Sequence, residues 1–129
     1  MYINMNLNPR GLHTGDCVIR GIALLEDQDW DTTFIGLCFI TLEYYELPDV
    51  NDIWREYLRR RGYSRHVLEN SCPYCYTVKD FCRDHPEGRY LACTGEHVVA
   101  VINGNYYDTH DTGDEIVSYF YKKEGSLNG

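Results

Sequence analysis

Apolar residues recur at helical spacing through the first half of the chain. A helix is expected from about Cys17 to Glu26, with Thr14 or Asp16 as its N-cap. A second helix is expected to begin near Asp31 and to end by Pro48, a residue that cannot continue a helix. The expected apolar stripe of this second helix consists of Phe34, Leu37, Cys38 and Leu42.

Two shorter helices are expected further along. The stretch "NDIWREYLRRRG" ends in the basic run Arg59–Arg61, which complements a helix dipole, and closes at Gly62. In "YTVKDFCRDHP", Thr77 and Asp80 have the spacing of a capping box, and Pro86 ends the helix. The expected buried face of the first of these two helices consists of Ile53 or Trp54 with Tyr57 and Leu58.

In the second half of the chain, the spacing of apolar residues becomes typical of strands. A short β-like segment at Ser64–Leu68 comes before this region. From Arg89 onward, "RYLAC", "HVVAVI", "NYYDTH" and "EIVSYFYKK" are typical of strands, and Asn103-Gly104 between two of them indicates a tight hairpin. Helices first and strands afterwards predict an α+β fold, with N-terminal helices packed on a C-terminal antiparallel sheet. The length favours one domain over residues 1–129.

Charge and composition narrow the classes of function. The formal net charge is −8, which argues against nucleic acid as a partner. No apolar run is long enough to span a membrane, and the start "MYINMNLNPRG" lacks the pattern of a signal peptide, so a cytoplasmic location is expected. In that reducing compartment the 6 cysteines are expected to be core residues, metal ligands or reactive thiols rather than disulfides.

The predicted hairpin brings chemically useful side chains together. With a two-residue turn at Asn103-Gly104, His97 falls opposite His110, and Asp108 lies diagonal to His97 on the same face. A carboxylate in that place would fix the tautomer of the imidazole and stabilise its charged form. If the turn were longer or bulged, Asp111 would take the place of Asp108.

Cys17 is the candidate partner of this pair. A thiol at the start of a helix lies in positive potential, which favours the thiolate, and a nearby histidine can complete its activation. Gly21 and Leu24 continue the same helix face, where the glycine would let a sheet approach closely. Alone, Cys17 would more often be a core residue, and His97 a satisfied strand histidine; their joint placement favours a catalytic site.

"TGDCVIRGIALL" followed by "GEHVVAVINGNYYDTHDTGD" resembles the papain-like cysteine peptidase superfamily, in its compact bacterial and phage-type members. The resemblance covers Thr14–Glu26 and Arg89–Tyr121. It implies a papain-like fold with Cys17 as nucleophile at the start of a central helix, His97 as base on a strand, and Asp108 as the orienting residue on the next strand. The glutamine that often precedes the cysteine in this superfamily is missing here.

That departure leaves the oxyanion donor open. The amide of Cys17 would serve, with a side chain from Asn8 or His13. The expected function is a thiol-dependent hydrolase or acyltransferase acting on an amide, isopeptide or thioester bond of a peptide or protein substrate, without metal or organic cofactor. The oligomeric state is left open.

Two other functions compete with this one. The first is an inactive protein of the same fold that binds or inhibits a partner. The second is a zinc-stabilised interaction module, since Cys72, Cys75, Cys82 and His85 supply four residues of zinc-ligating type at workable spacing. "CPYC" also has the spacing of a redox motif, but the strand and helix expected around such a motif are not predicted here.

Overall fold

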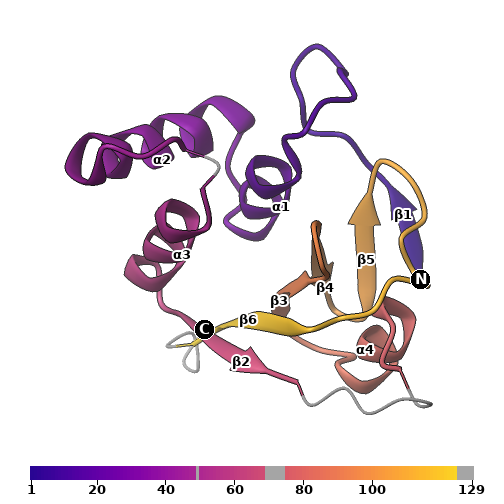
Figure 1. Cartoon of the computed structure of the whole chain (residues 1–129). Helices are drawn as coiled ribbons and strands as arrows, with labels where there is room; N and C mark the ends of the chain where they lie inside the picture. Colours follow the sequence, from indigo (N-terminus) through magenta and orange to yellow (C-terminus); the bar gives the residue numbers. More distant parts are fainter. Residues whose placement is uncertain (49, 69–74, 125–129) are drawn as a thin grey trace.

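The computed structural model describes residues 1–48, 50–68 and 75–124. In these ranges the chain forms helices and strands in an α+β arrangement, as predicted (Figure 1). The elements are β1 Tyr2–Asn4, α1 Cys17–Leu25, α2 Trp30–Tyr44, α3 Asn51–Arg60, β2 Tyr63–Val67, α4 Val78–Asp84, β3 Arg89–Cys93, β4 Val98–Ile102, β5 Asn105–Asp108 and β6 Tyr119–Lys123.

The strands form one mixed sheet in the order β1-β5-β4-β3-β6-β2. The expectation of a purely antiparallel, C-terminal sheet is wrong at one edge, because β1 comes from the N-terminus and runs parallel to β5, with Tyr2 opposite Tyr106. A strand of 3 residues is too short to show alternation in the sequence. β1 covers the edge of β5, the strand that ends at Asp108.

Both faces of the sheet are covered. Alternation along β3 sends Leu91 and Cys93 to one face and Tyr90 and Ala92 to the other. The first face packs against α1 and α3, with α2 packed on those two helices, and the second packs against α4, whose Phe81 is fully buried. Figure 1 shows α1 to α3 on one side of the sheet and α4 on the other. The sheet is therefore the middle layer of the molecule, and α1 is the helix closest to its centre.

The close approach of α1 to the sheet depends on Gly21. A Cβ atom at this position would lie 2.9 Å from Cδ1 of Leu91 and 3.8 Å from Cγ2 of Val98. This confirms the prediction that the glycine lets the sheet pack near Cys17. The helix runs from Cys17 to Leu25, one residue short of the predicted end.

The packing of α2 corrects two predictions. Its buried residues are Thr33, Leu37 and Ile40, whereas Leu42, predicted to be in the stripe, is 67 % exposed. The helix is apolar almost all round, so its periodicity could not select the face that packs on α1 and α3. It also ends before Pro48, because Tyr45 takes a left-handed conformation with φ of 58°.

The remaining elements follow the sequence closely. The predicted face of α3 is buried, the capping box of Thr77 and Asp80 is present on α4, and Arg59 lies in the last turn of α3. Asn103 and Gly104 have φ of 50° and 78°, as a type I′ turn requires. The last strand is shorter than predicted and begins at Tyr119.

A search of the described ranges for a helix long and apolar enough to cross a membrane finds none.

Candidate functional site

Cys17 is the first residue of α1 and is partly buried against the sheet. The ring of His97 and the backbone amide of Val98 lie close enough to the thiol to lower its pKa. Both partners lie where β4 begins, directly after the two-residue turn Gly95-Glu96 that joins it to β3. The helix start and the strand start therefore meet at the sulfur atom.

His97 also contacts the neighbouring strand. Its Nε2 donates a hydrogen bond to Oδ2 of Asp108 over 2.7 Å, so the predicted contact between these two residues is present. The ring of His97 thus interacts with both the thiol and the carboxylate.

Asp108 is buried and has further donors. The hydroxyl of Thr112 donates to Oδ2 over 2.9 Å, and the amide of Thr109 donates to Oδ1 over 2.8 Å. Asp111, the other candidate for the orienting residue, instead accepts a hydrogen bond from the hydroxyl of Tyr106. The hairpin has the two-residue turn on which the choice of Asp108 depended.

The predicted pairing of His97 with His110 is present only in part. The β4–β5 ladder pairs Ala100 with Tyr107 and goes no further in that direction. The two histidine rings nevertheless lie 5.8 Å apart between centroids, and His110 is exposed. His110 is therefore a neighbour of the site.

The electrostatics of the three residues favour an ion pair. Burial raises the pKa of the Cys17 thiol, but hydrogen bonds from His97 and Val98, with the charges of His97 and Arg20, outweigh it and lower that pKa below its usual value. The hydrogen bonds with Asp108 and then Cys17 raise the pKa of His97 to about 10, against the opposing effect of burial. These shifts favour a thiolate beside an imidazolium over two neutral groups.

Two other described thiols behave in the opposite way. Burial raises the pKa of Cys82 to about 11 and that of Cys93 to about 12. Neither thiol would be ionised at neutral pH, so both are interpreted as core residues rather than as reactive thiols.

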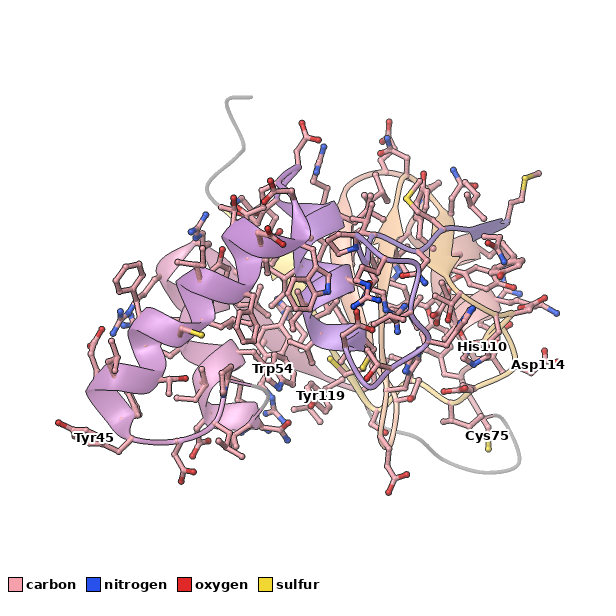
Figure 2. All side chains as sticks on the ribbon, turned by 90° about the horizontal axis from the view of Figure 1, so that it is seen from above. Tyr45, Trp54, Cys75, His110, Asp114 and Tyr119 are labelled. Carbon is pink, nitrogen blue, oxygen red and sulfur yellow. The ribbon has the colours of Figure 1, made fainter. Side chains whose placement is uncertain are left out.

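Two hollows lie beside His97, and one of them also borders Cys17. One, of about 220 Å³, is lined by Cys17 and His97 together with Trp54 and Tyr119. A second, of about 680 Å³, lies on the other side of the turn before β4 and is lined by His97, His110 and acidic residues that include Asp114. In Figure 2, Trp54 and Tyr119 lie near the centre of the molecule, and His110 and Asp114 lie toward one end.

The two side chains considered as oxyanion donors lie elsewhere. The Nδ2 of Asn8 donates to Oδ2 of Asp16 over 3.0 Å, and its Oδ1 accepts from the amides of Arg10 and Leu12. His13 is exposed in the loop before α1. The side chain of Asp16 does not cap α1. A role for the backbone amide of Cys17 as oxyanion donor stays a prediction.

Sequence reasoning missed two residues of the site. Arg20 donates to both Asp16 and Asp108, and Thr112 donates to Asp108. The spacing of Asp16 and Arg20, four residues apart on one helix face, was a signal for the first pair. Nothing in the sequence indicated that the same guanidinium would reach Asp108, which is 88 residues further along the chain.

The zinc hypothesis concerns residues around α4. Cys82 is buried, and Nδ1 of His85 lies 2.8 Å from the carbonyl oxygen of Phe81. Over residues 1–48, 50–68 and 75–124, no group of three or more potential ligand residues is placed to hold a metal ion. Cys72 lies outside the described residues, so the proposed set of four ligands remains a prediction.

The sequence and the fold were compared with known proteins. No family model matches the chain, and no curated protein or solved structure is significantly similar to it.

Proposed function

We propose that the protein is a thiol-dependent hydrolase or acyltransferase of papain-like type, with Cys17 as nucleophile, His97 as acid and base, and Asp108 as the orienting residue. The observation that carries this proposal is the position of the His97 ring, which is hydrogen-bonded to the buried Asp108 carboxylate and close enough to the Cys17 thiol to shift its pKa. Nucleophile, base and orienting group in this order are typical of activated thiols.

The chemistry follows from the ion pair. The Cys17 thiolate attacks the carbonyl carbon of an amide, isopeptide or thioester, and the amide of Cys17 stabilises the oxyanion. His97 then gives its proton to the leaving group, and a thioester with Cys17 remains. In the second half, His97 takes a proton from water or from an acceptor amine or thiol, which attacks the thioester and releases Cys17 as thiolate. These steps require no cofactor.

Site-resolved alkylation tests the proposal. With limiting iodoacetamide at pH 7, we expect Cys17 to react at least tenfold faster than Cys82 or Cys93 because thiolate is the reactive form. His97→Ala should reduce the Cys17 rate by on the order of 100-fold, since a partly buried thiol without its cation keeps its proton. Mass spectrometry of the peptides gives each rate.

His110→Ala is the matched control. This histidine lies 5.8 Å from His97 between ring centroids, is exposed, and its Nδ1 contacts Oγ1 of Thr109 over 3.4 Å. Its removal should leave the Cys17 rate within about twofold of the unaltered protein. Equal labelling of all thiols, or a Cys17 rate that does not depend on His97, would contradict the proposal.

A further inference from the structure

Arg20 lies on α1 one turn after Cys17 and is almost fully buried, with 12 % of its side chain exposed. Its Nε donates to Oδ1 of Asp16 over 2.7 Å. Its Nη1 donates to Oδ1 of Asp108 over 3.4 Å. One guanidinium thus connects the helix that carries the thiol to the strand that carries the orienting carboxylate.

Asp16 is itself held firmly in place. Its Oδ2 accepts from Nε1 of Trp30 over 2.9 Å and from Nδ2 of Asn8 over 3.0 Å. The residue is 5 % exposed. A carboxylate at the N-cap position would ordinarily bond the free amides of the helix, but here none of its oxygens does so. Its hydrogen bonds hold Arg20 and the loop before α1 instead.

The charges of the site alternate in sign along a continuous path. Asp16, Arg20, Asp108, His97 and Cys17 are each in contact with the next. Without the guanidinium, two buried carboxylates would lose their common cation, and His97 would be the one cationic partner left to Asp108 among the described residues. The oxygen of Asp108 that Arg20 contacts is Oδ1, whereas His97 contacts Oδ2, so the two cations do not compete for one atom.

We propose that Arg20, held by Asp16, is a positioning residue that fixes the carboxylate of Asp108 and thereby sets the geometry and charge of the Cys17–His97 pair; this inference rests on the proposed function. Arginine is suited to this role because its planar fork bonds two carboxylates in fixed directions. A lysine would bring the charge, but a single ammonium could not hold both acids in this geometry.

Other ionisable groups also face the thiol. Besides Arg20 on α1, they are His97 at the start of β4, Cys93 on β3, Tyr107 on β5, Tyr119 on β6 and Glu96 in the turn before β4. The effect of Arg20 must therefore be measured as a difference between variants in which these groups are unchanged.

The test is the pH profile of Cys17 alkylation by iodoacetamide in the full chain. Arg20→Gln should raise the midpoint of the profile by about one pH unit and slow labelling at pH 6 about tenfold, because a cation near the thiolate is lost and His97 is less well held. Arg20→Lys should restore about half of the shift. A purely structural role would lower the melting temperature and leave the midpoint unchanged.

Arg83→Gln is the matched control. Arg83 also bridges two aspartates, Asp80 and Asp84, but on the exposed side of α4. It should leave the midpoint unchanged. If Arg20→Gln does not fold, Arg20→Lys decides, since it keeps the buried charge; a midpoint within about 0.2 pH unit of the unaltered protein would overturn the inference.

Failure of this inference differs from failure of the proposed function. If His97→Ala slows the labelling of Cys17 and the Arg20 variants keep the original midpoint, only the role of Arg20 is wrong. If His97→Ala has no effect on Cys17, the ion pair itself is absent and both proposals fall.

Discussion

Cys17 on α1 and Cys93 on β3 both contact the core between the helices and one face of the sheet, but their thiols differ in pKa. Cys93 is fully buried in the core between the helices and the sheet, with its Sγ 3.7 Å from the carbonyl oxygen of Leu91, and its pKa is raised to about 12. Cys17 packs against the same core, but its pKa is lowered, because His97, the amide of Val98 and Arg20 surround the sulfur.

The difference shows what distinguishes a thiol with a lowered pKa from a core thiol in this molecule. Burial disfavours the thiolate at both positions. Only at Cys17 do a protonated imidazole and a backbone donor reverse that effect, and both come from the start of β4. The position of His97 and Val98 at the start of β4, more than burial, therefore decides which thiol has the lowered pKa.

The largest expected effect comes from Asp108→Asn, which removes the charge that keeps His97 protonated. His97 has a pKa of about 10 in the folded chain against a reference value of 6.5, so this stabilisation is complete below pH 6.5 and is lost as pH rises through 10. We expect the variant to lower the free energy of unfolding by about 3 kcal/mol at pH 6 and by much less near pH 10, measured by urea titration.

Asp108→Asn should also make the Cys17 thiol less ionised, as the Cys93 thiol is. Alkylation of Cys17 at pH 7 should then slow about tenfold. Asp114→Asn is the control, since Asp114 is exposed and pairs only with Lys79 among the described residues. A loss of stability that is the same at pH 6 and pH 10 would show that His97 is not the group through which Asp108 acts.

A smaller effect is expected from Gly21→Val, which alters the spacing that both thiols depend on. The new Cβ would lie 2.9 Å from Cδ1 of Leu91, so the end of that side chain or α1 itself must shift to make room. We expect the free energy of unfolding to fall by about 2 kcal/mol and the Cys17 rate to fall as the sulfur moves away from His97. Thermal unfolding and site-resolved alkylation measure the two quantities.

Gly15→Val is the control for that change, because no atom lies within 4 Å of a Cβ built at Gly15. It should leave stability within about 0.5 kcal/mol of the unaltered protein. If both valines had the same effect, close packing at Gly21 would not be what brings Cys17 to the sheet.

The smallest effect is expected from Cys93→Ala. Removal of a buried sulfur should cost about 1 kcal/mol of stability, because a small cavity is left in the core. The alkylation rate of Cys17 at pH 7 should stay within about twofold, since Cys93 is neutral there. A marked loss of Cys17 reactivity would mean that the two thiols act together, and the contrast between them would no longer hold.

The local parts of the site could be predicted from the sequence because each depends on neighbours along the chain. The start of α1 at Cys17, the capping box of α4 and the turn at Asn103-Gly104 are local patterns. The turn also fixed the register that places Asp108 beside His97. Alternation in one hairpin thus predicted two members of the candidate site.

The face of α2 could not be predicted, because a helix that is apolar all round has no period to select the buried side. The parallel strand β1 was missed for a similar reason, since 3 residues give no alternation. The link from Arg20 to Asp108 joins residues that are far apart in the chain, and no local pattern reports such a contact.

By itself, the sequence determined the helices, the hairpin and most of the strands, since helix caps, turn residues and alternation act over a few neighbouring residues. Only the tertiary structure decided that α1 lies against β3 and β4 at Gly21, that Cys17 meets His97 there while Cys93 stays in the core, and that Arg20 joins the two acids. These are long-range contacts, and they depend on how the layers pack rather than on the order of residues within any one segment.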